Sequence, residues 1–195
     1  SPYPDVDSGD WYNNAVSTLA NMGIMEGKDD GAFHPLDAIT KAEFATIAVR
    51  FFDHTAEYRE GTFADVDAAV WYADYVQAAS DVGLIEGNGS GYFEPMRYIT
   101  RAEAATIVNR TLGRVPHEDH LLPWAEMITW PDNADMQAWY YEAMQEATNS
   151  HDYSWTTEDG ERVEQWTGKL DERDWAALER EWSNANSAPG GEIMQ

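Results

Sequence analysis

The chain has 195 residues, with 12 Lys and Arg against 36 Asp and Glu, a formal net charge of −24 and no cysteine. Without cysteine, disulfide scaffolds, cysteine-ligated metal sites and thiol nucleophiles are excluded. The negative charge repels nucleic-acid phosphates and anionic lipid headgroups, so an anionic partner requires a local basic site. No apolar run approaches the ~18 residues of a membrane-spanning helix. A hydrophobic content of 43% is enough for a folded core.

An internal repeat organises the chain. Residues 5–50 match residues 65–110 without a gap, and about 20 of the 46 aligned positions are identical. A weaker third copy begins at Trp130 and keeps a Trp-Tyr pair at Trp139-Tyr140. We interpret the chain as three repeats, numbered 1 to 3, that form one pseudo-trimeric module, followed by a flexible tail. The repeats span residues 1–53, 62–115 and 124–182, and the tail spans 183–195.

Repeats 1 and 2 each predict a helix, a glycine-rich turn and a second helix. The first helix has an apolar stripe with helical spacing, and Gly23 or Gly83 follows it as a left-handed cap. In repeat 2 the stripe is Trp71, Tyr75, Ala79 and Val82, and repeat 1 has Trp11, Ala15, Leu19 and Met22. Core packing is therefore the favoured interpretation of the Trp at the start of each first helix, Trp139 included. The alternative is a flat face for a sugar ring.

The start of the second helix carries the candidate binding residues. Thr40-x-x-Glu43 and Thr100-x-x-Glu103 both fit a capping box, which explains Thr and Glu structurally. Lys41 and Arg101 follow the Thr, where the helix macrodipole disfavours a cation. Since folding gives no evident reason for this charge, we expect a small anion site made of the cation and free backbone amides. An ordinary solvated side chain is the alternative for each.

These motifs together resemble the S-layer homology repeat of bacterial surface proteins. The resemblance rests on the Trp-Tyr pair, the Gly-x-x-x-Gly turn, Phe-x-Pro and Ile-Thr-Lys/Arg-Ala-Glu, and it is strong over residues 3–115 and weak over 124–182. It implies a mainly α three-pronged spindle, in which the first helices of the repeats form a central three-helix bundle. It also implies grooves between repeats that bind a secondary cell-wall polysaccharide ending in pyruvylated N-acetylmannosamine. In such a groove, the resemblance further implies, the basic residue of the motif contacts the carboxylate of the pyruvyl group.

On this interpretation the ligand-binding residues are Arg101, Lys41, Thr100, Glu103, Thr40 and Glu43, with the charges of Arg101 and Lys41 primary. Arg101 is expected to be the stronger site, because a guanidinium donates two parallel hydrogen bonds to a carboxylate while Lys41 acts as a point charge. Trp71 and Trp11 are the possible aromatic wall.

Repeat 3 departs from the pattern. If its second helix begins at Asp171, the motif reads Asp171-Glu172-Arg173-Asp174, and Glu172 replaces the cation, so a third carboxylate-binding groove is doubtful. Asp159-Gly160 lies between two segments rich in aromatic and β-branched residues, which predicts a short β-hairpin.

The predicted function is a non-catalytic, extracellular anchoring module of a larger bacterial surface protein, monomeric and without a cofactor or metal. His117-x-x-His120 lies in a Pro-flanked linker and favours a solvated loop over a metal site. Two other classes stay open. One is an S-layer lattice or protein-interaction module that binds no glycan. The other is a wall-glycan hydrolase, for which proximity of two carboxylates is no indication in a chain with 36 of them.

Overall fold

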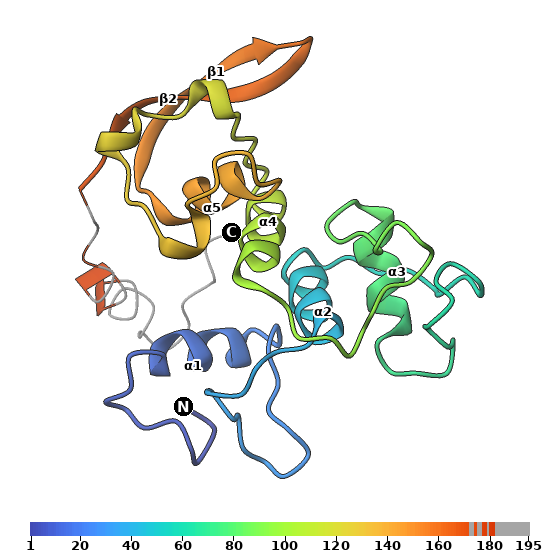
Figure 1. Cartoon of the computed structure of the whole chain (residues 1–195). Coiled ribbons are helices and arrows are strands. Elements are labelled where there is room, and N and C mark those ends of the chain that lie inside the picture. Colours follow the sequence, from blue (N-terminus) through green and yellow to red (C-terminus); the bar gives the residue numbers. More distant parts are fainter. Residues whose placement is uncertain (172–173, 175–176, 179, 182–195) are drawn as a thin grey trace.

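Five α-helices and one β-hairpin are found in the residues that the computed structural model describes, which are 1–171, 174, 177–178 and 180–181. The helices are α1 (Asn13–Asn21), α2 (Lys41–Phe51), α3 (Ala73–Asp81), α4 (Arg101–Thr111) and α5 (Tyr141–Thr148), and the strands are β1 (His151–Glu158) and β2 (Glu161–Lys169). Figure 1 shows three lobes, which contain α1, α3, and α5 with the hairpin, around the helices α2 and α4. Three short 3₁₀ helices, η1 (Glu118–His120), η2 (Trp124–Glu126) and η3 (Pro131–Asn133), lie between α4 and α5.

The predicted order of helix, turn and helix is confirmed in repeats 1 and 2. Both capping boxes at the starts of α2 and α4 are also confirmed: in each, the Thr hydroxyl accepts from the Glu backbone N–H, and the Glu carboxylate accepts from the Thr N–H. Gly23 and Gly83, which follow α1 and α3, have φ of +72° and +69°, as a left-handed cap requires. These features depend on neighbouring residues only, so the local sequence determines them.

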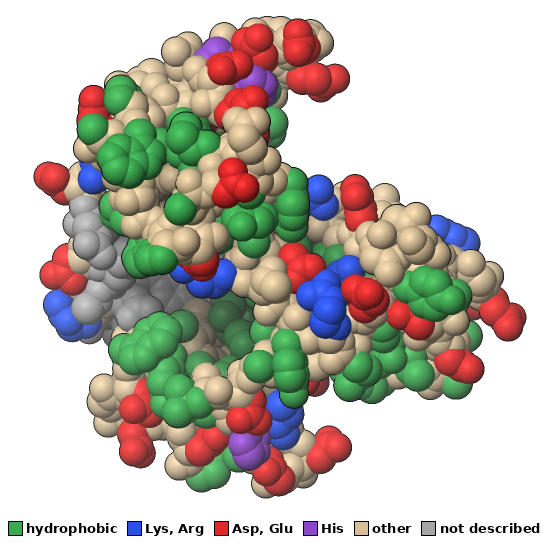
Figure 2. Space-filling view, in the orientation of Figure 1, with side chains coloured by type: hydrophobic (Ala, Val, Ile, Leu, Met, Phe, Trp, Pro, Cys, Tyr) green, Lys and Arg blue, Asp and Glu red, His purple; other side chains and the backbone are tan. Residues whose placement is uncertain are grey.

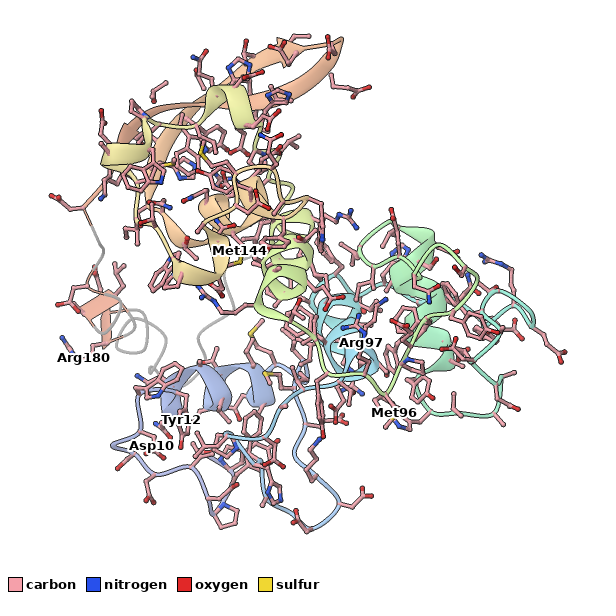
Figure 3. All side chains as sticks on the ribbon, viewed as in Figure 1. Asp10, Tyr12, Met96, Arg97, Met144 and Arg180 are labelled. Atoms are coloured by element: carbon pink, nitrogen blue, oxygen red, sulfur yellow. The ribbon has the colours of Figure 1, made fainter. Side chains whose placement is uncertain are left out.

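Helices pack in pairs that join one repeat to the next. α2 of repeat 1 packs against α3 of repeat 2, α4 of repeat 2 packs against α5 of repeat 3, and α2 also approaches α4. The α2–α3 contact lies in a core of small side chains, among them Ala45, Ala48, Val76 and Ala79. Met144, on α5, is buried at the α4–α5 contact (Figure 3).

This pairing differs from the expected central bundle of the three first helices. Among the described elements, the second helices α2 and α4 occupy the centre, and α1, α3 and α5 lie outside them (Figure 1). The physical reason is a face of α2 that carries small, buried side chains, so neighbouring helices can pack closely against it. These side chains belong to Ala42, Ala45, Ala48 and Val49.

The expectation that the Trp residues pack in the core is wrong. Trp11, Trp71 and Trp139 are 90%, 61% and 70% exposed. The cause is the helix boundary, because α1, α3 and α5 begin two residues after each Trp, which therefore lies outside the helical stripe. The Tyr that follows turns inward in its place: Tyr72 is 9% exposed and meets Trp71 edge to face, with ring centroids 5.3 Å apart.

Repeat 3 contains the predicted hairpin. β1 and β2 pair antiparallel, and both turn residues have positive φ, +49° at Asp159 and +87° at Gly160, as a type I′ turn requires. Asp171 was expected to cap a second helix of repeat 3. The capping contact is instead made by Asp174, whose carboxylate accepts from Ala177 N at 2.9 Å. Two acidic residues three positions apart both satisfy the sequence rule. The expected role of Glu172 falls outside the described residues.

Acidic side chains cover the outer ends of all three lobes, with few basic ones among them (Figure 2). In the described part of the chain, none of the helices has the length and apolar character to cross a bilayer.

Candidate functional site

A groove lies at the start of α4, between repeats 2 and 3. Its volume is about 400 Å³. Repeat 2 contributes the end of the loop before α4 and the first helical turn, and repeat 3 contributes η3 and the Trp-Tyr pair. The lining residues are Arg97, Thr100, Arg101, Ala102, Glu103, Asp132, Trp139 and Tyr140.

Arg101 reaches from α4 across this groove to repeat 3. Its Nη1 lies 2.8 Å and 3.0 Å from the two carboxylate oxygens of Asp132, and the guanidinium stacks 4.9 Å above the ring of Trp130. The side chains of Arg101 and Asp132 are 51% and 49% exposed. The predicted cation is therefore accessible, and it already faces a carboxylate.

Arg97 neutralises the capping carboxylate beside it. Its Nη1 donates to Glu103 Oε2 at 3.0 Å, and its Nε donates to Glu94 at 3.1 Å. The hydrogen bonds from Arg97 lower the pKa of Glu103 to about 2, with the backbone N–H of Thr100 adding to the effect. Figure 3 shows Arg97 beside α2, on the segment that leads to α4. Glu103 thus stays ionised as a cap, and its charge is largely balanced. Glu43 has a comparable arrangement, with Lys28 as its partner.

The first turns of α2 and α4 differ in the hydrogen bonds of their first two backbone N–H groups. In α2, Lys41 N donates to Arg97 O at 2.8 Å and Ala42 N donates to Pro95 O at 3.0 Å, so the Phe-x-Pro segment of repeat 2 closes the helix end. In α4 the corresponding N–H groups of Arg101 and Ala102 have no hydrogen-bond partner within the described residues. Repeat 3 has the β-hairpin where such a segment would follow α5.

Lys41 is buried rather than presented to a ligand. It is 6% exposed, its Nζ donates to Glu86 O at 2.8 Å, and it lies 4.5 Å from the ring centroid of Phe93. Burial lowers the pKa of Lys41, and the nearby charge of Arg97 lowers it further. The premise that folding gives no reason for this charge is therefore wrong for Lys41, because the ammonium links repeat 1 to the interior of repeat 2.

The predicted ligand-binding residues did not include Arg97, Asp132 or Trp139, and Trp139 was named only among the tryptophans that could offer a flat face to a sugar ring. Trp139 lines the groove together with Arg101. The internal repeat does not indicate this pairing, because Lys41, which has the position of Arg101 in repeat 1, contacts Glu86 O and Phe93 instead of a Trp. The structure thus pairs Arg101 with Trp139 in one groove, whereas Trp71 and Trp11 do not line it.

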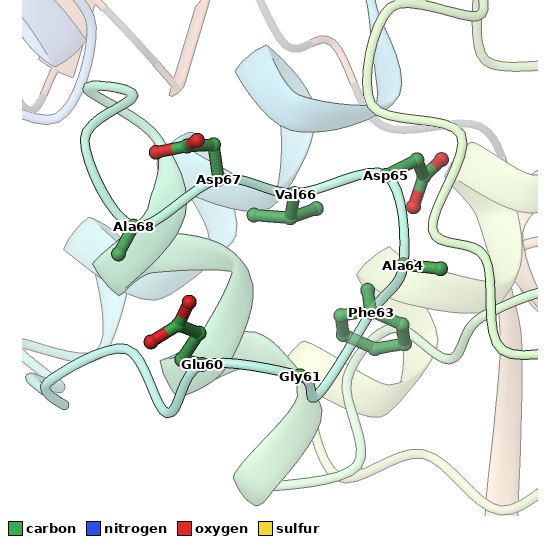
Figure 4. Close-up of a pocket in the computed structure, with 8 residues that line it drawn as sticks. All are labelled: Glu60, Gly61, Phe63, Ala64, Asp65, Val66, Asp67 and Ala68. Atoms are coloured by element: carbon green, nitrogen blue, oxygen red, sulfur yellow. The ribbon is translucent and has the colours of Figure 1, made fainter.

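A second hollow, of about 570 Å³, lies inside the loop before α3 (Figure 4). Glu60, Asp65 and Asp67 are its charged lining residues. Asp65 accepts hydrogen bonds from Phe93 N and Glu94 N at 2.8 Å and 2.7 Å, so its carboxylate holds the Phe-x-Pro segment. This hollow is a poor candidate for the predicted anion.

One buried cluster in repeat 3 has the donor types of a metal site. Ligand atoms of Glu146, His151 and Glu164 lie within 4.8 Å of one another. Arg114 already fills the space: its Nη2 lies 2.6 Å, 2.8 Å and 3.0 Å from Glu146 Oε1, Glu164 Oε2 and His151 Nε2. A guanidinium nitrogen thus takes the place of a metal ion, and the cluster joins the end of repeat 2 to the hairpin.

The two linker histidines are part of the fold rather than of a solvated loop. Their ring centroids lie 5.4 Å apart, and His120, which belongs to η1, contacts Glu158 of β1 through Nε2 at 3.0 Å. His117 accepts from Asp119 N at the start of η1.

Comparisons with known proteins match the repeats. The family model for the S-layer homology domain matches residues 2–45 and 62–105. The chain is 38% identical over 98 residues to the surface-layer 125 kDa protein of Lysinibacillus sphaericus, covering 50% of this chain and 8% of the relative. It is 26% identical over 166 residues to a cellulosome-anchoring protein of Acetivibrio thermocellus, covering 83% of this chain and 35% of the relative. It is 37% identical over 113 residues to an amylopullulanase of Thermoanaerobacterium thermosulfurigenes, covering 54% of this chain and 6% of the relative.

The chain thus spans from 6% to 35% of the length of these three relatives. Each matched stretch contains one of the two capping boxes and the basic residue that follows its Thr. The chain therefore carries two tandem S-layer homology domains, at residues 2–45 and 62–105.

Proposed function

We propose that this chain is a non-catalytic module that anchors a larger extracellular protein to the bacterial cell wall by binding an anionic wall glycan in the groove between repeats 2 and 3. S-layer homology domains anchor surface proteins to the cell wall. One of the relatives is named a cellulosome-anchoring protein and another a surface-layer protein. The match covers only 6% of the amylopullulanase, which supports a role for the matched region that is separate from the enzyme's named activity.

The observation that carries the proposal is the exposed guanidinium of Arg101 beside the open first turn of α4. Three features of the groove favour an anion here: the fixed positive charge, the amides of Arg101 and Ala102, which have no partner among the described residues, and the positive end of the helix macrodipole. They act together in a chain of net charge −24, where nonspecific attraction of an anion is absent.

The groove also fits the rest of a sugar. Trp139 is 70% exposed and lines the groove with Tyr140, so its indole is available to stack on a sugar ring. We propose a glycan end that combines a ring with a carboxylate, and pyruvylated N-acetylmannosamine is the specific candidate. Thr100 and Glu103 contribute mainly by capping α4.

The groove between repeats 1 and 2 is proposed as the weaker position. For Lys41 to reach a ligand, its ammonium must leave Glu86 O and Phe93, and the first amides of α2 are occupied. We therefore assign Lys41, with Thr40 and Glu43, to holding the repeats together, and Trp71 and Trp11 to outer contacts with a longer glycan. The three repeats act as one pseudo-threefold unit in this proposal.

Isothermal titration tests the proposal directly. The wild-type chain and Arg101→Ala are titrated with synthetic pyruvylated N-acetylmannosamine and with its non-pyruvylated counterpart. Arg59→Ala is the matched control, because Arg59 is also an exposed arginine in an ion pair, with Asp81, and lies outside the groove. We expect binding of the pyruvylated sugar only, at least tenfold weaker in Arg101→Ala and unchanged in Arg59→Ala.

Equal binding by Arg101→Ala and wild type, with both folded, would contradict the assignment of the groove. Absence of binding to either sugar, together with self-association of the chain, would favour the lattice module instead.

A further inference from the structure

Asp132 places a carboxylate against the guanidinium of Arg101, where a ligand carboxylate is expected. Both of its carboxylate oxygens lie within 3.0 Å of Nη1. The remaining donors of the guanidinium, at Nε and Nη2, have no hydrogen-bond partner in the described part of the chain. The contact is therefore a partial one, and it leaves donors for a second carboxylate to exploit.

The backbone that carries Asp132 is fixed, while its side chain is not. Trp130, two residues before Asp132, stacks on Arg101. The following residue, Asn133, is 2% exposed and donates from Nδ2 to Tyr141 O at 3.3 Å. Asn133 N also donates to Trp130 O at 2.9 Å, which closes η3. The carboxylate of Asp132 is 49% exposed. A rotation about its side-chain bonds can thus release Arg101 without unfolding η3 or moving Trp130.

The counterpart of Asp132 in the preceding repeat has a different contact. With one residue inserted before the Trp-Tyr pair of repeat 3, Trp130-Pro131-Asp132 aligns with Phe63-Ala64-Asp65. The Asp65 carboxylate accepts hydrogen bonds from Phe93 N and Glu94 N. Lys41 correspondingly contacts a backbone carbonyl and an aromatic ring instead of a carboxylate. The internal carboxylate is therefore a feature of the groove between repeats 2 and 3.

From these contacts we infer that Asp132 is an internal competitor that occupies the anion position of the Arg101 groove and sets the selectivity of that groove. The inference rests on the proposed function and concerns its regulation. Binding exchanges one carboxylate for another at Arg101, because two carboxylates beside one guanidinium repel each other. A ligand therefore gains affinity only through contacts that Asp132 does not make, namely those with Trp139 and with the first amides of α4. Small carboxylates such as acetate are thereby rejected, and a glycan with a ring beside its carboxylate is accepted.

The test is the affinity of Asp132→Asn for the same synthetic pyruvylated N-acetylmannosamine. Asparagine keeps the shape of the side chain and removes its charge. A half-exposed ion pair contributes about 0.2–1 kcal/mol, so removal of the competitor is expected to tighten binding by a factor of about 1.4 to 5. Asp152→Asn, which neutralises an exposed carboxylate of β1, controls for the change in net charge and is expected to leave the affinity unchanged.

Two further measurements separate competition from a structural brace. In an Arg101→Ala background, Asp132→Asn should give no gain, since the competitor acts only through Arg101. Titration with sodium acetate should show weak binding to Asp132→Asn and none to the wild type. A brace predicts the opposite, with weaker sugar binding once Asp132 no longer holds Arg101 in place.

The outcomes are distinguishable. If the wild type binds the sugar and folded Asp132→Asn binds it equally or more weakly, the competitor role is overturned and the proposed function stands. If neither the wild type nor any variant binds the sugar, both are overturned. Tighter binding by Asp132→Asn that disappears in the Arg101→Ala background supports the inference.

Discussion

The two basic residues of the repeated motif are predicted to respond very differently to truncation, although they occupy the same position in their repeats. Lys41→Ala removes a buried ammonium that donates to Glu86 O at 2.8 Å and lies 4.5 Å from the ring centroid of Phe93. Arg101→Ala removes a guanidinium that is 51% exposed. We expect the first change to reduce the stability of the fold and the second to leave it nearly intact.

The magnitude follows from the contacts of Lys41. A hydrogen bond from a charged group contributes about 1.5–3 kcal/mol, and a desolvated cation–π contact about 2 kcal/mol. The release of a buried charge offsets part of this loss, so the net cost of Lys41→Ala is about 2–4 kcal/mol. For Arg101→Ala the exposed pair with Asp132 is worth about 0.2–1 kcal/mol. In a chain of this size 1 kcal/mol shifts the Tm by about 2–4 °C. The expected loss of Tm is therefore roughly 4–16 °C for Lys41→Ala and less than about 4 °C for Arg101→Ala.

Thermal unfolding followed by circular dichroism measures both changes. Lys41→Met is the matched control, because it keeps the aliphatic packing of the side chain and loses only the ammonium, and its Tm should fall between those of wild type and Lys41→Ala. A Tm of Lys41→Ala within 2 °C of wild type, or a larger loss in Arg101→Ala than in Lys41→Ala, would refute the structural role assigned to Lys41.

Two further changes probe the ionic contacts around the groove and in repeat 3. Glu103 has a pKa of about 2, below its ordinary 4.5, so it contributes up to about 3 kcal/mol of stability that is complete above pH 4.5 and is lost as the pH falls towards 2. Urea unfolding of Glu103→Gln should therefore show a shallower loss of stability than wild type between pH 4.5 and 2, and parallel curves would contradict the Arg97–Glu103 contact. Arg114→Met leaves the carboxylates of Glu146 and Glu164, 2% and 0% exposed, without their cation, and should cost about 3–5 kcal/mol at pH 7. Adding Glu164→Gln should recover part of that loss, and a single variant as stable as wild type would show that the cluster is not held by charge.

Features set by adjacent residues could be predicted from the sequence. The capping boxes at Thr40 and Thr100 need only residues three apart. The Asp159-Gly160 turn needs two residues with positive φ. In all of these the partners of each hydrogen bond lie within the same few residues, so no knowledge of the tertiary structure is required.

Features set by the next repeat could not be predicted in the same way. The partners of Lys41 and Arg101 are 45 and 31 residues away, and spacing along one helix does not tell which surface of another repeat that helix meets. The exposure of Trp71 was missed because α3 starts two residues later than its apolar stripe suggested, and such a shift turns a side chain from the core to the surface. The cation at Arg101 was identified from the sequence, but Asp132, the carboxylate that contacts it, was not.

The divergence of repeat 3 explains why the groove at α4 is open while the position at α2 is closed. In repeat 2 the Phe-x-Pro segment folds back so that Pro95 O and Arg97 O take the first amides of α2, and Ile99 N pairs with Ile39 O beside them. Repeat 3 has a hairpin there, anchored elsewhere through Arg114 and Glu164. Without such a segment, the amides of Arg101 and Ala102 have no partner in the part of the chain that the structure describes, and Trp139 lines the same groove. The repeat that departs most from the pattern is thus the one whose departure creates space for a ligand, and restoring a Phe-x-Pro segment after α5 would be expected to close it.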